Sequence, residues 1–227
     1  MYTGHAHTAA GRPEPVRTMS CIPSFPLRRF EVIAIAASTG GPGLVERLVA
    51  GLPADLPLPI LVAQHLPPQF TVSFAAQLDR AGPLSAVHAA DGMPIHPGTV
   101  YVGPGRQHLR VVGQTPQGVH AEVSPQPEYL TFKPSADELF RSCAKVYGSK
   151  VLAIVLTGIG RDGTEGARAV RDAGGVVLAQ DAVTCAVYGM PRSVFEAGFA
   201  QAQLTPDDIQ RAILQLSPQH RGQAILQ

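Results

Sequence analysis

The fold is decided by one stretch near the start of the chain, E-V-I-A-I-A-A-S-T-G-G-P-G at residues 31–43. Its first seven residues are almost continuously apolar, a pattern typical of a β-strand that is covered on both faces. A glycine-rich turn follows, and apolar residues then recur at helical spacing from Leu44 to Leu52. A buried strand, a tight turn and an amphipathic helix in this order predict an α/β fold with a parallel sheet.

The same alternation of strand and helix continues along the chain. Further buried strands are predicted over residues 59–63, 151–156 and 176–179. Helices are predicted over residues 44–52, 70–78, 135–147, 164–173, 191–197 and 207–216. Short, partly alternating runs at 99–102, 109–112 and 119–123 favour hairpin strands at one edge of the sheet. The sequence therefore predicts a single α/β domain with a mostly parallel sheet and an antiparallel edge hairpin.

The amino-acid composition limits which classes of partner the protein can bind and in which compartment it is expected. The 227 residues are 45% hydrophobic and 15% charged, which excludes an intrinsically disordered chain. Eighteen basic and 17 acidic residues leave a net charge of +1, so we predict no nucleic-acid partner. No apolar run reaches the roughly 18 residues of a membrane span, and we predict no membrane insertion. Cys21, Cys143 and Cys185 lack the spacing of a disulfide or zinc framework, which favours the reducing cytoplasm.

The two ends of the chain differ from its middle. Residues 1–28 are rich in Pro, Thr, His and Arg and are predicted to be a flexible segment. We expect one domain over residues 29–216 and a tail over 217–227. His5 and His7 could contact a metal, but no third ligand accompanies them, so no metal site is predicted.

Three polar residues follow the most apolar strands. Ser38 ends the first strand, His65 follows the second, and Asp162 lies in the loop after residues 151–156. Parallel strands bring their carboxyl ends, and the loops after them, to one edge of the sheet, where ligands bind in such folds. A serine needs a base to act as a nucleophile, a histidine supplies one, and an aspartate fixes the histidine tautomer. The backbone N–H groups of Thr39 and Gly40, at the start of a helix, could stabilise an oxyanion.

Each of these residues also has a simpler interpretation. Ser38 or Thr39 could cap the following helix, His65 could be a structural histidine, and Asp162-Gly163 is a common turn. The glycine turn could instead hold a phosphate, but S-T-G-G-P-G matches neither phosphate-binding fingerprint. An α/β-hydrolase is also disfavoured, because Ala36 stands where G-x-S-x-G requires glycine and the order Ser, His, Asp differs.

Six strings in order along residues 30–200 resemble the catalytic domain of the CheB family of chemotaxis protein-glutamate methylesterases. These strings are AASTGGP (36–42), AQHLPPQFT (63–71), DGMPIHPGTVYVGPG (91–105), KPSADELF (133–140), LTGIGRDGTEG (156–166) and AQDAVTCAVYGMPR (179–192).

The resemblance implies a doubly wound α/β sheet and a Ser38–His65–Asp162 triad. The implied reaction is hydrolysis of glutamate γ-methyl esters on the cytoplasmic helices of chemoreceptors, with glutamine deamidation as a possible second activity. No cofactor is implied. The resemblance also suggests that the backbone N–H of Ile159 joins the oxyanion site.

The chain departs from the family pattern in ways that concern docking. The family usually adds an N-terminal receiver domain, and about 30 residues before the first strand are too few for one. Val72 replaces a basic residue that many members carry, and Ile159 replaces a frequent methionine. A catalytically silent docking module is therefore the alternative function. Residues proposed to contact the substrate, or to form a basic rim for acidic helices, are Arg106, Arg110, Arg161, Met190 and Arg192.

Overall fold

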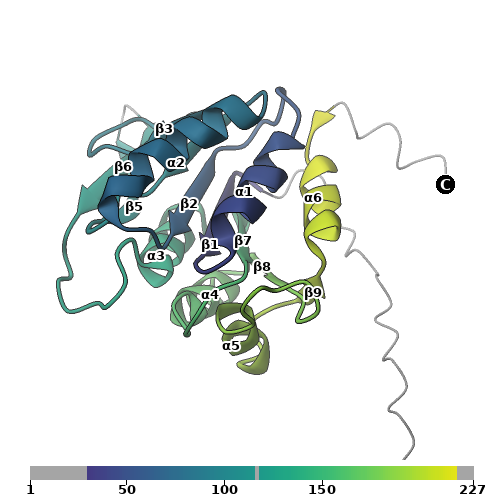
Figure 1. Ribbon diagram of the computed structural model, residues 1–227. Coiled ribbons are helices and arrows are strands. Elements are labelled where there is room, and N and C mark those ends of the chain that lie inside the picture. The colour runs from purple at the N-terminus through teal and green to yellow at the C-terminus, as the bar shows by residue number, and fades with distance from the viewer. Residues whose placement is uncertain (1–29, 116–117, 219–227) are drawn as a thin grey trace, which may run out of the picture.

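Seven parallel strands form the central sheet in the order β3-β4-β2-β1-β7-β8-β9 (Figure 1). The structure is a computed structural model that describes residues 30–115 and 118–218, so the predicted flexible segment and most of the predicted tail lie outside the described residues. The strands are β1 Val32–Ala37, β2 Ile60–Gln64, β3 Ser85–His88, β4 Thr99–Val102, β7 Val151–Val155, β8 Val176–Gln180 and β9 Ala202–Leu204.

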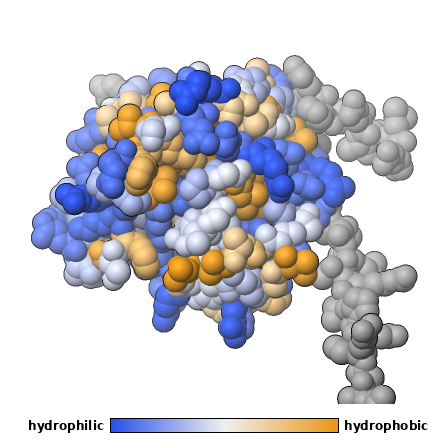
Figure 2. Space-filling model, in the orientation of Figure 1, coloured by the Kyte–Doolittle hydropathy of each residue, from blue (hydrophilic) through white to orange (hydrophobic). Residues whose placement is uncertain are grey.

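Helices cover both faces of this sheet, and this confirms the predicted doubly wound α/β class (Figure 1). One face carries α1 Gly41–Ala50, α2 Pro68–Ala81 and α6 Pro206–Leu214. The other carries α3 Ala136–Tyr147, α4 Thr164–Asp172 and α5 Met190–Glu196, and a short 3₁₀ turn, Gly148–Lys150, follows α3. On the face of the molecule in Figure 2, apolar residues are seen as separate patches among hydrophilic ones.

The apolar run that opens the sheet is explained by these two layers. Within β1, Ile33 and Ile35 pack against α1 and α2, whereas Ala34 and Ala36 pack toward α3. Every residue of β1 is buried, because each face of the strand meets a helical layer. The alanines leave room for α3 to approach the sheet closely.

The hairpin is antiparallel as predicted, but it forms a second sheet instead of extending the first. Its strands are β5 His108–Thr115 and β6 Gly118–Ser124, and its apolar residues pack against α3. The run at 99–102 is not a hairpin strand, because as β4 it pairs in parallel with both β2 and β3. The short strands β3 and β9 were not predicted from the sequence.

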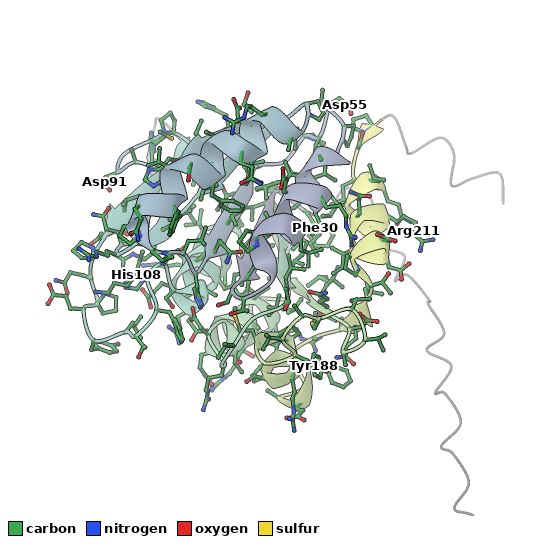
Figure 3. The ribbon with its side chains drawn as sticks, in the orientation of Figure 1. Phe30, Asp55, Asp91, His108, Tyr188 and Arg211 are labelled. Carbon is green, nitrogen blue, oxygen red and sulfur yellow. The ribbon has the colours of Figure 1, made fainter. Side chains whose placement is uncertain are left out.

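The topology brings the predicted site loops together. The chain builds outward from β1 through β2 to β3 and β4, then returns to the other side of β1 as β7. Strands β2, β1 and β7 are therefore neighbours, and the order of winding reverses at β1, the position where open α/β sheets bind ligands. Asp55, before β2, and Tyr188, beside the loop after β7, lie at opposite ends of the molecule (Figure 3).

Candidate active site

Ser38 is held by its own backbone at the end of β1. Its N–H donates to Thr157 O at 3.0 Å, and its carbonyl accepts the N–H of Gly41 at 2.8 Å. The same carbonyl accepts the side-chain amide of Gln64 at 2.9 Å. Only 9% of Ser38 is exposed, so the residue is largely covered at the carboxyl edge of the sheet.

His65 and Asp162 are directly hydrogen-bonded. His65 Nε2 lies 2.8 Å from Asp162 Oδ2, and each side chain is 8% exposed. The backbone N–H of His65 donates to Ala37 O at 2.9 Å, which ties the loop after β2 to β1. The two residues are 97 positions apart in the chain and meet because β2 and β7 flank β1.

The carboxylate of Asp162 is surrounded by donors at the start of α3. Its Oδ1 accepts the Ser135 hydroxyl at 2.9 Å and the Asp137 N–H at 3.1 Å. Its Oδ2 accepts the Ala136 N–H at 2.7 Å besides His65. Burial, the largest influence, raises the pKa of Asp162, but the bonds from His65 and these N–H groups outweigh it, and the net pKa is lowered. Asp162 is therefore ionised at neutral pH.

The second ring nitrogen of His65 is buried and has no hydrogen-bond partner within the part of the chain that the structure describes. Because Nε2 donates to Asp162, Nδ1 carries the free lone pair. The Phe132 ring stacks on the imidazole at a centroid distance of 4.4 Å with an interplanar angle of 1°. Within residues 30–115 and 118–218, the Ser38 hydroxyl forms no hydrogen bond, so the expected contact between Ser38 and His65 is not formed in this structure.

Unpaired backbone donors lie near Ser38, at the positions predicted for an oxyanion site. Thr39, Gly40 and Ile159 are exposed, and among the described residues none of their N–H groups has a hydrogen-bond partner. Gly40 has φ of 81°, and a Cβ there would lie 2.6 Å from the side chain of Ala186, so glycine is required. The Cβ of Ser38 lies close enough to Gly158 that a side chain on Gly158 would collide with it.

Two buried glutamines support these loops, and the sequence analysis missed both. Gln64 ends β2, and its amide donates to the carbonyls of Ser38 and of His65 at 2.9 and 3.2 Å. Gln180 ends β8 and accepts the Thr157 N–H at 2.8 Å. Thr157 in turn donates its hydroxyl to Thr39 O at 2.9 Å. A polar residue at the end of an otherwise apolar strand is the signal that could have identified them.

A second buried histidine, also missed, braces the start of α3. His108 has no exposed surface; its Nδ1 accepts the Ser135 N–H at 3.1 Å, and its Nε2 lies 3.3 Å from Pro127 O. Ser135 is the N-cap of α3 and also donates its hydroxyl to Asp162. Burial lowers the pKa of His108, which favours the neutral ring that this pattern requires.

The remaining predicted contact residues lie in different environments. Arg161 is exposed, pairs with Glu165 at 4.0 Å and lines a hollow of about 200 Å³ beside Asp162. Met190 is fully buried, with its sulfur against Gly158. Arg192 is exposed on α5, where its Nε donates to Glu196 at 2.8 Å. Arg110 is engaged in bonds to Glu122, Glu138 and the carbonyl of Gln126, so it braces the hairpin rather than facing a partner.

The fold and the site define a doubly wound α/β protein with a serine, a histidine and an aspartate grouped at the carboxyl edge of its sheet. The chain belongs to the CheB methylesterase family, whose model matches residues 33–213. This confirms the family that the six sequence strings indicated.

Named relatives and a solved structure agree with this assignment. The chain is 46% identical over 200 residues to protein-glutamate methylesterase/protein-glutamine glutaminase 3 of Anaeromyxobacter dehalogenans, covering 87% of this chain and 58% of the relative. It is 42% identical to the corresponding protein 2 of Caulobacter vibrioides, covering 90% and 60%. The chain thus spans about 60% of the length of these relatives. The crystal structure of the Thermotoga maritima CheB methylesterase catalytic domain matches with a TM-score of 0.79 at 38% identity, covering 82% of this chain and 98% of that one.

Proposed function

We propose that this chain is a serine hydrolase that removes methyl groups from glutamate γ-methyl esters of chemoreceptors. The observation that carries the proposal is the hydrogen bond between His65 and Asp162 in the loops next to Ser38, which leaves the other ring nitrogen of His65 without a partner among the described residues. Membership of the CheB methylesterase family and the names of the relatives support the same reaction.

The proposed reaction passes through an acyl-enzyme. Ser38 Oγ attacks the ester carbonyl while its proton passes to Nδ1 of His65, and Asp162 stabilises the imidazolium. The N–H groups of Thr39 and Ile159 donate to the oxyanion. The C–O bond to methanol then breaks, and the leaving oxygen takes the proton from His65. Water, activated by the same nitrogen, releases the glutamate and restores Ser38.

The same steps would convert a glutamine to a glutamate, with ammonia in place of methanol as the leaving group. The relatives are named protein-glutamine glutaminases as well as methylesterases, which supports this second activity. An amide is the poorer substrate, because its nitrogen must be protonated before it leaves. We expect deamidation to use the same residues at a lower rate.

The proposed substrate is the methylated helical segment of a chemoreceptor on its cytoplasmic side. None of the helices in residues 30–115 and 118–218 is long and apolar enough to cross a bilayer. We propose that the protein acts in the cytoplasm, without inserting into the membrane. Arg161 and Arg192 remain proposals for substrate contact, whereas Met190 is fully buried against Gly158 and does not reach the surface.

Methanol release from a methylated receptor fragment tests the proposal. Wild-type protein should release methanol, and Ser38→Ala should lower the rate at least about 10³-fold without changing the melting temperature. Ser149→Ala, an exposed serine before β7 at the opposite end of the sheet, is the matched control and should retain full activity. Binding of the receptor with no methanol release, and no labelling of Ser38 by a fluorophosphonate, would instead support the silent docking module.

A further inference from the structure

A second hollow, which we call the basic hollow, lies beside the catalytic histidine. Its volume is about 510 Å³. Its lining residues are Leu66, Pro67, Pro68, Arg106, Glu128, Leu130, Thr131 and Lys133. Leu66 directly follows His65, and Leu130 and Thr131 also line the smaller hollow at Asp162. The basic hollow therefore borders the site along the segment between β6 and α3, the teal loop beside α3 in Figure 1.

The charges in the basic hollow are not balanced within the molecule. In the part of the chain that the structure describes, Arg106 and Lys133 form no ion pair and no hydrogen bond. Glu128, the one carboxylate of the lining, accepts the side-chain amide of Gln126 at 3.2 Å. By contrast, Arg161 and Arg192 near the same edge are each paired with a glutamate of their own helix region. Two cations and one carboxylate give the lining a net positive charge, which together with its leucines and prolines fits an anionic side chain.

Arg106 also has an unusual backbone. Its φ is 65°, and among the described residues it is the one non-glycine residue with a positive φ. Holding a side chain in this left-handed region costs about 1 kcal/mol. Such a cost is typical of positions where a side chain must be directed at a partner. Arg106 lies in the loop after β4, at the same sheet edge as Ser38, and its side chain lines the basic hollow.

We propose that the basic hollow binds an acidic side chain of the substrate helix, about two helical turns from the esterified glutamate. This rests on the proposed function. Ser38 follows β1 and Arg106 follows β4, and β2 alone separates these strands. Neighbouring strands lie about 4.8 Å apart, so the ends of β1 and β4 are about 10 Å apart. A helix rises about 1.5 Å per residue, so a helix lying across these ends covers that distance in about seven residues.

The test pairs enzyme variants with substrate variants. The substrates are methylated receptor fragments with an acidic residue seven positions before or seven positions after the ester, each in turn replaced by glutamine. With wild-type enzyme, one of the two replacements should lower kcat/KM about tenfold at low ionic strength, mainly through KM. The double variant Arg106→Gln, Lys133→Gln should show the same tenfold loss of kcat/KM on the unaltered fragment. On the fragment whose acidic residue has been replaced by glutamine, the double variant and the wild-type enzyme should have the same kcat/KM.

Three controls separate docking from chemistry. Arg80→Gln, at the far end of α2, removes another exposed arginine that is unpaired among the described residues, and should leave kcat/KM unchanged. Hydrolysis of p-nitrophenyl acetate, which is too small to reach the basic hollow from Ser38, should be the same in all variants. Arg106→Glu should lose activity on the normal fragment and regain it when the acidic residue is replaced by lysine.

Two results would overturn the inference while the proposed function stands. One is an unchanged kcat/KM on the receptor fragment when both cations of the hollow are neutralised. The other is a loss in those variants that is identical for substrates with and without the acidic residue. Absence of methanol release by the wild-type protein would contradict the proposed function itself.

Discussion

A carboxylate that accepts four hydrogen bonds cannot be replaced by a group that also donates without the loss of at least one of these bonds. Asp162 accepts from Ser135, Ala136, Asp137 and His65. An asparagine at this position would direct its amide N–H₂ at one of these donors, and it would no longer stabilise the imidazolium of His65.

We therefore predict that Asp162→Asn lowers kcat for ester hydrolysis by about 10²- to 10⁴-fold and also lowers the melting temperature. Methanol release and thermal unfolding measure the two effects. Asp172→Asn, on the exposed side of α4, is the matched control and should change neither. A variant with unaltered kcat would mean that the carboxylate acts only in folding.

At the same scale, the sequence predicted the residues whose position follows from the strands that precede them. Ser38, His65 and Asp162 each come just after a strongly apolar run, so their shared edge follows from parallel pairing. The bond between His65 and Asp162 follows from the predicted triad, but the donors from Ser135, Ala136 and Asp137 to Asp162 depend on how α3 packs and could not be predicted. His108 and Phe132 act through contacts with residues far away in the chain, and no local pattern marks such a role.

Among the elements, the hairpin, the loop after it and α3 are joined through His108. The ring nitrogens contact two different elements: Nδ1 accepts from Ser135 at the start of α3, and Nε2 lies against Pro127 O in the loop. Asparagine can supply the acceptor in place of Nδ1, whereas glutamine can supply the donor in place of Nε2.

We predict that His108→Gln lowers kcat about 10- to 100-fold, because it loses the bond that fixes Ser135 and with it Asp162. His108→Asn should keep kcat within about threefold of wild type. Steady-state kinetics on p-nitrophenyl acetate, with melting temperatures as the check on folding, separate the two variants. The reverse order of activities would show that the loop, and not the N-cap of α3, is what His108 positions.

Element boundaries were predicted well where the apolar pattern is long and poorly where it is short. The helix predicted over 135–147 spans Ala136–Tyr147, with Ser135 as its N-cap. The prediction of a hairpin strand at 99–102 is wrong, because four residues cannot distinguish a strand inside a sheet from one at its edge. Its true place depends on β3, which is itself only four residues long.

For the whole molecule, buried titratable groups set how stability depends on pH. Burial lowers the pKa of both His88 and His108 below 6.5. Between the lowered pKa of the folded state and 6.5, the unfolded chain binds more protons than the folded chain. The contribution of these two histidines to the free energy of unfolding is therefore complete above pH 6.5 and is lost as the pH falls. The lowered pKa of Asp162 acts in a lower range, because its stabilisation is present above 3.8 and is lost as the pH falls through the folded value.

We predict that the free energy of unfolding decreases between pH 7.5 and pH 5.5, and that this decrease is smaller in a His88→Gln, His108→Asn double variant. Urea denaturation of both proteins at the two pH values measures it. Burial raises the pKa of Asp137, which opposes the trend, but this group is the same in both proteins and cancels in the comparison. Equal losses of stability in the two proteins would show that the two histidines do not cause the decrease.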